Sequence, residues 1–210
     1  MRKFLHIALL LSIALSAHGQ KRPYVAPAEE DVRANIAQWQ DLKFGMFIHW
    51  GLYAIPARGE WVRSFEEIPK EDYMKYFDEF DPVDYDPKKW AKAAKEAGMQ
   101  YVVLTAKHHD GFCLFDSKYT DFKSTNTKCG RDLVAEFVEA VKGEGLKVGL
   151  YFTLLDWYHD DYPHYGDRNH PMRNNPAYKN DNRDFSRYVD YMHNQIRERS
   201  EEHTSELQSL

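Results

Sequence analysis

Three apolar runs separated by segments of helical character limit the fold of this chain more than any other feature. The runs are residues 44–51, 102–105 and 147–152. In the second run, apolar residues continue without polar alternation, as is typical of a strand buried on both faces. Strands that alternate with helices predict a parallel sheet with crossover helices, and therefore an α/β fold.

The clearest helical segment spans residues 86–98. Asp86 has the residue type of an N-cap, Pro87 suits the first helical position, and Gly98 is a stop signal. A long loop is expected between the first strand and this helix. Three further helices are predicted over residues 31–40, over residues 132–142 and from about Asp184 onward.

Polar or aromatic residues follow every predicted strand, and none precedes one. Active sites lie on that side of a (β/α)₈ barrel, but a doubly wound sheet places its sites there too. No glycine-rich phosphate loop follows any strand, which disfavours a nucleotide-binding fold. We therefore predict an α/β chain that forms about three βα units of a (β/α)₈-like TIM barrel, an incomplete barrel.

The composition narrows the class of ligand. Aromatic residues make up 15% of the chain, and many stand beside polar residues, a pattern that fits either a carbohydrate site or an aromatic-rich core. The net charge of -5 disfavours nucleic-acid binding, which usually needs a basic surface.

The first residues have the pattern of a secretory signal peptide. Two basic residues precede an apolar stretch at 4–15, and small residues follow it. We expect cleavage near Gly19, export to the periplasm or the medium, and no membrane attachment afterwards. An oxidising compartment permits a disulfide between Cys113 and Cys129, but we expect both thiols to be unpaired.

The last residues differ from the predicted helix before them. That helix is expected to carry one apolar face, made of Phe185, Val189, Met192 and Ile196, and an incomplete barrel is expected to leave this face exposed. Residues 199–210 abandon this period, and the stretch resembles the in-frame translation of a sequencing-library adapter. We therefore expect a partial catalytic domain over residues 20–198 and a non-native tail after it.

Histidines at the predicted strand ends permit three interpretations. In the first, His49, His108, His109 and Asp110 together bind a divalent metal for hydrolysis. Adjacent histidines point to opposite sides of a regular strand, however, which fits a shared metal poorly. Neutral imidazoles could instead bind sugar hydroxyls beside the rings of Trp61 and Trp157, or the polar residues could simply close the strand ends.

Five short motifs occur in order between Gln40 and Trp157. They are Phe44–Gly51, Glu60–Trp61, Ala106–Phe112, Gly130–Asp132 and Gly149–Tyr151 with Asp156–Trp157. In order and approximate spacing they resemble the retaining α-L-fucosidases of glycoside hydrolase family 29. The resemblance implies a (β/α)₈-like catalytic domain that removes terminal α-linked L-fucose from fucosylated glycans, with no metal and no other cofactor.

The resemblance also implies a set of substrate-binding residues. His49, His108 and His109 are expected to bind fucose hydroxyls, and Glu60 and Trp61 to help close the pocket. Tyr151 is expected near the anomeric carbon, and Trp157 at the pocket rim.

The catalytic carboxylates are not matched. A retaining glycosidase needs a nucleophile and an acid/base about 5–5.5 Å apart. The family places its nucleophilic Asp after strand four, and no such motif follows Trp157, which leaves Glu60 as a weak candidate for an assisting role. We therefore expect this 210-residue chain to be inactive. The rival functions are a metal-dependent barrel hydrolase and a non-catalytic sugar-binding module.

Overall fold

A computed structural model describes residues 29–180 and 182–207, with side chains up to Arg199. The predicted signal peptide lies outside these residues. The chain divides into two compact units, Met1–Asp41 and Leu42–Leu210. In the first unit the described structure is helix α1 (Glu30–Asp41), which confirms the helix predicted there. All further description concerns the second unit.

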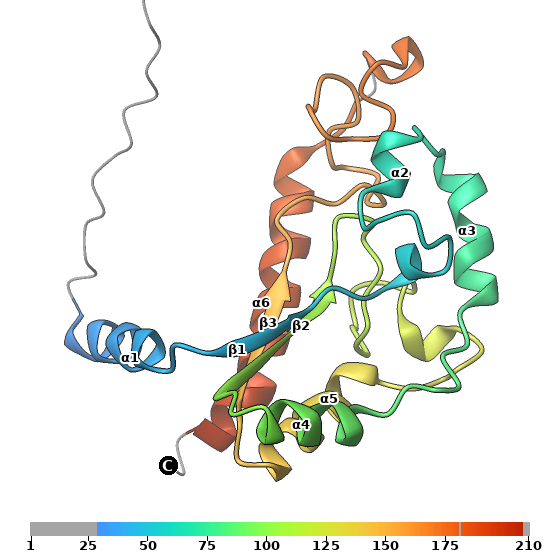
Figure 1. The fold of residues 1–210 in the computed structure, drawn as a ribbon. Coiled ribbons are helices and arrows are strands. Elements are labelled where there is room, and N and C mark those ends of the chain that lie inside the picture. Colours follow the sequence, from blue (N-terminus) through green and yellow to red (C-terminus); the bar gives the residue numbers. More distant parts are fainter. Residues whose placement is uncertain (1–28, 181, 208–210) are drawn as a thin grey trace, which may run out of the picture. The chain divides into compact units, whose positions relative to one another are not determined.

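The second unit contains a three-stranded parallel sheet in the order β1-β2-β3 (Figure 1). Its strands are β1 (Gly45–Ile48), β2 (Tyr101–Lys107) and β3 (Lys147–Phe152). The pairing of β1 with β2 and of β2 with β3 is parallel. All three predicted strands and their parallel arrangement are confirmed.

Helices α4 (Pro87–Glu96) and α5 (Leu133–Gly143) pack against each other, and α5 packs on β2 and β3. Both helices begin as the sequence indicates, because the Asp86 carboxylate accepts a bond from the Lys89 N–H at 3.1 Å. Asp132 accepts one from the Ala135 N–H at 2.8 Å. The main core contains fully buried residues from strand and helix alike, among them Leu104 and Phe137. Cys113 and Cys129 are free thiols, as predicted.

The long loop predicted before residue 86 contains two helices, so that part of the prediction was wrong. They are α2 (Val62–Phe65) and α3 (Lys70–Glu79). Helix α3 buries Tyr73 and Tyr76 and exposes charged residues between them, so its apolar face is too narrow to be recognised in the sequence. Short 3₁₀ turns lie at Leu52–Ala54, Ser124–Asn126 and Pro176–Tyr178.

Helix α6 (Phe185–Leu207) leaves its predicted apolar face partly exposed. Phe185 is 51% exposed, and the other three residues of the predicted apolar face are only half-buried. The buried side chains are instead Tyr188, Gln195, Glu198 and Arg199. No helix within the described residues is long and apolar enough to cross a bilayer.

Candidate active site

The carboxyl ends of the three strands bring His49, His108 and Tyr151 together. His49 and His108 directly follow β1 and β2, and Tyr151 lies near the end of β3. The ring centroid of His49 lies 5.4 Å from that of His108 and 5.7 Å from that of Tyr151. Three segments far apart in the sequence therefore place their polar rings at one edge of the sheet.

A second group of rings joins the first through His109. Its centroid lies 4.3 Å from that of His108, 5.1 Å from that of Trp61 and 5.3 Å from that of Trp157. Six of the seven residues expected to bind substrate thus form one group of contacting rings. We call it the six-ring cluster: His49, Trp61, His108, His109, Tyr151 and Trp157.

Two adjacent histidines join the same cluster because both lie beyond the end of β2. The strand ends at Lys107, and the chain then turns, with the Gly111 N–H donating to the His108 carbonyl at 3.0 Å. The strand is also irregular before this turn, since Thr105 pairs with Tyr151 but Lys107 pairs with Phe152. The expectation that His108 and His109 point apart assumed that a regular strand continues through them, and it does not.

The cluster is exposed on one side and closed on the other. His49 is exposed, and Trp61 and Tyr151 are half-buried. His108 and His109 are buried, and Trp157 is 0% exposed. Trp157 therefore packs behind Trp61 and His109 and does not occupy the exposed rim expected for it. Its backbone N–H donates to the His109 carbonyl at 2.7 Å, which holds the residue inside.

Burial keeps the two inner histidines neutral. It lowers the pKa of His108 to about 3, and nearby His109 and His49 lower it further. Burial, together with His49, also lowers the pKa of His109. A neutral imidazole has one donor and one acceptor nitrogen, as an alcohol partner requires. His109 Nδ1 lies 2.5 Å from Thr153 Oγ1, whereas buried His108 Nδ1 has no hydrogen-bond partner within the described residues.

Glu60, the seventh expected residue, is exposed on the loop before α2. Its carboxylate makes no ring contact, but its charge acts on His109. Burial and His49 lower the pKa of that histidine, and the charges of Asp167 and Glu60 oppose the shift. Glu60 therefore lies within electrostatic range of the six-ring cluster.

Asp110 is turned away from the cluster. Its Oδ2 accepts a bond from the Tyr73 hydroxyl at 2.9 Å, and its Oδ1 accepts one from the Phe112 N–H at 3.2 Å. Burial raises the pKa of Asp110 to about 6. A metal site built from Asp110 and the three histidines does not fit this geometry. Within the described residues, no group of three or more His, Cys, Asp or Glu side chains converges on a possible metal position.

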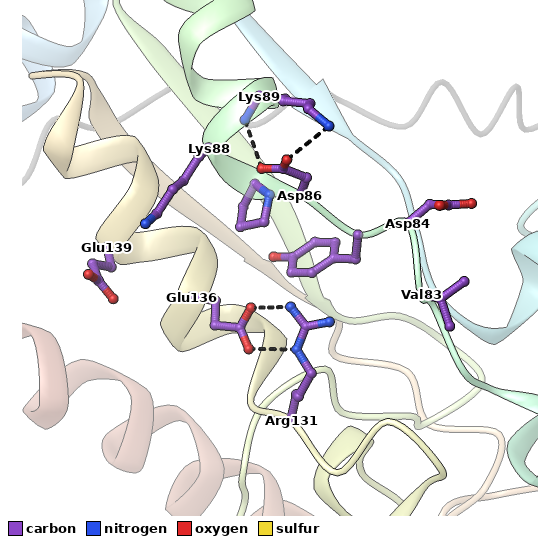
Figure 2. Close-up of a pocket in the computed structure, with 10 residues that line it drawn as sticks. Val83, Asp84, Asp86, Lys88, Lys89, Arg131, Glu136 and Glu139 are labelled. Carbon is purple, nitrogen blue, oxygen red and sulfur yellow. Dashed lines mark hydrogen bonds and ion pairs between the residues drawn. The ribbon is translucent and has the colours of Figure 1, made fainter.

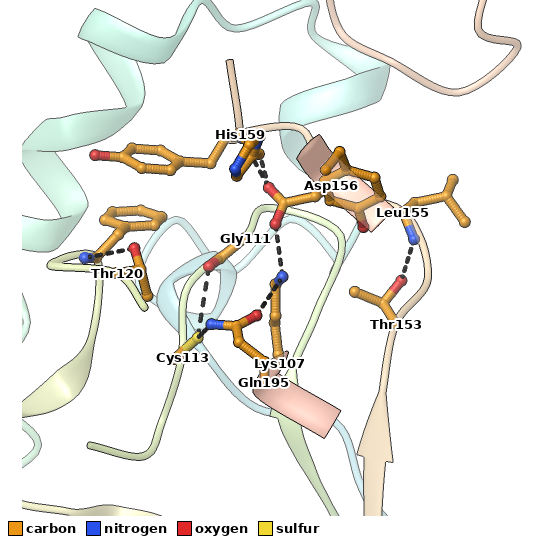
Figure 3. Close-up of polar contacts among 12 residues, drawn as sticks. Lys107, Gly111, Cys113, Thr120, Thr153, Leu155, Asp156, His159 and Gln195 are labelled. Atoms are coloured by element: carbon orange, nitrogen blue, oxygen red, sulfur yellow. Dashed lines mark hydrogen bonds and ion pairs between the residues drawn. The ribbon is translucent and has the colours of Figure 1, made fainter. Parts of the chain in front are cut away.

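Polar residues that were not expected to bind substrate make contacts next to the cluster, and Figure 3 shows the contacts among them. The Lys107 amine lies 2.6 Å from Asp156 Oδ2, and both side chains are buried. Thr153, which contacts His109, comes from the segment just after β3. The only sequence signal for these roles was their position next to the expected site residues.

A separate surface pocket lies where α4 and α5 begin (Figure 2). Four of its charged groups form two ion pairs: Arg131 with Glu136 on α5, and Lys89 with Asp86. None of the seven expected site residues lines it. The pocket is therefore not the candidate active site.

The buried histidine makes stability depend on pH. An unfolded chain protonates His108 near pH 6.5, but the folded protein does so only near pH 3. The free energy of unfolding should therefore fall as the pH falls from 6.5 toward 3. Urea unfolding of His108→Gln should show a smaller fall between pH 7 and pH 4.5, by roughly 2 kcal/mol.

The comparison between the two proteins isolates His108 from other groups. The raised pKa of Asp110 changes the free energy of unfolding in the opposite direction, because its protonation near pH 6 favours the folded state. Both proteins carry Asp110, so its contribution cancels. Equal pH slopes in the two proteins would mean that His108 is not a buried neutral imidazole.

Known proteins match this chain over most of its length. A family model described as "Alpha-L-fucosidase" matches residues 11–207. An alpha-L-fucosidase of Branchiostoma floridae is 34% identical over 177 residues, which cover 74% of this chain and 39% of that relative. A tissue alpha-L-fucosidase of Rattus norvegicus is 33% identical over 175 residues, which cover 74% of this chain and 38% of that relative.

Solved structures agree with this match. Alpha-L-fucosidase isoenzyme 1 from Paenibacillus thiaminolyticus superposes with a TM-score of 0.77 at 65% identity, over 79% of this chain and 40% of that one. A GH29 alpha-L-fucosidase from Bacteroides thetaiotaomicron gives a TM-score of 0.68 at 37% identity, over 80% of this chain and 38% of that one.

The chain spans about two fifths of the length of these relatives. The described sheet with its helices is part of a (β/α)₈-like barrel, which confirms the predicted fold class. The resemblance inferred from the motifs is confirmed as well. The chain belongs to the alpha-L-fucosidases of glycoside hydrolase family 29.

Proposed function

We propose that this protein is an exo-acting α-L-fucosidase that removes terminal α-linked L-fucose from glycans by a retaining double displacement. In this proposal the six-ring cluster, together with Glu60, binds the fucosyl group. The relatives are alpha-L-fucosidases, which supports the activity. The observation that carries the binding site is buried His108, whose Nδ1 lacks a hydrogen-bond partner within the described residues.

The chemistry of the cluster suits a sugar. Fucose presents several hydroxyls, which neutral imidazoles bind as donor and acceptor, and an unbonded buried nitrogen gains a partner when a hydroxyl arrives. Half-buried Trp61 offers a ring face to the C–H surface of a pyranose. Exposed His49 and half-buried Tyr151 complete the open side of the cluster.

Hydrolysis needs more than this cluster. Retaining glycosidases use two carboxyl groups about 5–5.5 Å apart. Within the described residues, Asp110 is bound to Tyr73 and Asp156 is paired with Lys107, so Glu60 is the expected site residue whose carboxylate remains available. We therefore expect the 210-residue chain to bind L-fucose without hydrolysing α-L-fucosides.

Two measurements on the purified protein test the proposal. Isothermal titration with L-fucose should show binding, with D-arabinose, which lacks the methyl group, as the weaker control. Incubation with 4-nitrophenyl α-L-fucoside should release no nitrophenol. Absence of L-fucose binding would refute the proposed site, and release of nitrophenol would refute the expected inactivity.

His49→Ala should weaken L-fucose binding without destabilising the fold. His49 is exposed, so its removal leaves no cavity, whereas a lost hydrogen bond to a hydroxyl lowers the affinity about 3- to 10-fold. Titration with L-fucose measures the first effect, and urea unfolding measures the second. His193→Ala, which removes an exposed histidine of α6, is the matched control and should change neither. Unchanged affinity in His49→Ala would remove His49 from the site.

We propose fucosylated glycans or oligosaccharides as substrates and, on the pattern of residues 2–19, export of the protein after cleavage near Gly19. Mass spectrometry of the N-terminus of protein secreted by a bacterial host tests the cleavage. A mature chain that retains residues 1–19 would contradict the proposed export.

A further inference from the structure

A buried ion pair joins the end of β2 to the segment after β3, and both of its residues adjoin members of the six-ring cluster in the chain. Lys107 Nζ lies 2.6 Å from Asp156 Oδ2, and the two side chains are 0% and 1% exposed. The other carboxylate oxygen of Asp156 accepts the backbone N–H groups of Tyr158 and His159, each at 2.9 Å. Asp156 thereby fixes the turn that carries Trp157.

Helix α6 supplies a second partner for Lys107. Nζ donates to Gln195 Oε1 at 3.0 Å, as Figure 3 shows. The Gln195 amide in turn donates to Ser117 Oγ at 3.1 Å. The amine also lies 4.7 Å from the ring centroid of Tyr191, another residue of α6. A helix about 80 residues downstream in the sequence thus fixes the position of the Lys107 amine.

Each member of the pair is a chain neighbour of a cluster residue. Lys107 directly precedes His108, and Asp156 directly precedes Trp157. The Trp157 N–H donates to the His109 carbonyl at 2.7 Å, so the two segments are joined both by the ion pair and by the backbone. A change in the separation of Lys107 and Asp156 must therefore move His108 and His109 relative to Trp157.

The Asp156 side chain has no room to adopt another position. Gly111 lies against Asp156, and a Cβ atom at that residue would stand 2.5 Å from Asp156 Oδ1. Water does not reach the pair, so removing one charge leaves the other buried without a partner, which is costly.

We propose that Lys107, Asp156 and Gln195 form a positioning network that sets the spacing of the sugar-binding rings. The three residues act through their neighbours and do not touch the sugar. The inference rests on the proposed function, because it concerns the affinity of that same site for L-fucose.

Lys107→Met is the main test, because it keeps an unbranched side chain only one atom shorter and removes the charge. At pH 7 it should weaken L-fucose binding about 10-fold or more, because the unpaired carboxylate forces the two segments apart. In the unaltered protein, Lys107 holds the pKa of Asp156 low although burial acts to raise it. Without the Lys107 charge, burial raises the pKa of Asp156. Protonation of Asp156 as the pH falls toward 5 should then remove the unpaired buried charge and restore part of the affinity for L-fucose.

The charged groups around Asp156 define the controls. Between pH 5 and 8 the relevant neighbours are Lys107, Arg63, Asp110 and His159. Burial raises the pKa values of the nearby tyrosines and of Cys113, which therefore stay neutral. Lys107→Met/Asp156→Asn retains Arg63, Asp110 and His159. It should recover affinity to within about 3-fold of the unaltered protein and lose the added pH dependence.

The outcomes separate positioning from a merely structural role. If Lys107→Met lowers stability in urea while L-fucose affinity stays within about 2-fold at every pH, the network does not position the site. Gln195→Met, which keeps the ion pair, is the second variant should Lys107→Met fail to fold. It should weaken binding about 3-fold or more, and an unchanged affinity would overturn the proposal. Failure of the unaltered protein to bind L-fucose would instead refute the proposed function.

Discussion

Gly111→Ala should lower the free energy of unfolding by about 2–5 kcal/mol, the sum of a backbone cost and a steric cost. Gly111 has a φ of 86°, a region that a residue with a Cβ atom rarely adopts. The added Cβ would stand 2.5 Å from Asp156 Oδ1 and 2.6 Å from Tyr158 Cβ. Asp156 cannot move aside, because Lys107 and two backbone N–H groups hold it.

Gly98→Ala is the matched control for this experiment. Gly98 follows α4 with a φ of 80°, but a Cβ atom there would meet nothing within 4 Å. Its cost should be the backbone cost alone, about 1–2 kcal/mol. Urea unfolding of both variants measures the difference. Equal destabilisation would mean that the contact between Gly111 and Asp156 adds nothing to the backbone effect.

Trp157→Ala should destabilise the protein by about 3–5 kcal/mol, as is usual for a buried aromatic replaced by alanine. Trp157 is 0% exposed and forms, with Tyr162 and Tyr188, a small core separate from the main one. Its removal leaves a cavity next to Trp61 and His109, whose ring centroids lie 5.6 Å and 5.3 Å away. L-fucose binding should be lost as well, because these two rings would lose their support.

Leu154→Ala provides the control within the same segment. Leu154 is 63% exposed, so its truncation should change the free energy of unfolding by no more than about 0.5 kcal/mol. The loss in the free energy of unfolding for Trp157→Phe should lie between the losses for Trp157→Ala and Leu154→Ala, because the smaller ring fills part of the space. A loss below about 1 kcal/mol in Trp157→Ala would mean that the cavity collapses or that the residue is not buried in solution.

Sequence reasoning succeeded where a local signal determines the structure. The cap Asp86 was recognised in the sequence and the start of the next helix was expected near Asp132; both carboxylates accept a bond from the N–H three residues later, an interaction that needs no distant partner. The sheet followed from the alternation of strands and helices. The carboxyl ends of parallel strands lie at one edge, so His49, His108 and Tyr151 were expected to meet, and they do.

Sequence reasoning failed where a residue distant in the chain determines which side chains are buried. The apolar face of helix α6 was recognised in the sequence, but the burial of Gln195 was not, because Gln195 accepts a bond inside the fold from the distant Lys107 amine. Trp157 was expected at a rim, yet its neighbour Asp156 is drawn inward by the same amine. Neither effect is visible within a short window of sequence. Helix α3 was missed because its buried face contains only Tyr73 and Tyr76.

The turn that follows β2 has a consequence for protein engineering. His108 and His109 lie in one cluster because they follow Lys107, the last residue of the strand, and stand where the chain turns. A designer who grafts the pair onto an idealised barrel strand would transfer the side chains and lose their convergence. The unit that can be transplanted is therefore the irregular backbone from Thr105 to Gly111 together with Asp156, the residue against which its last glycine is packed.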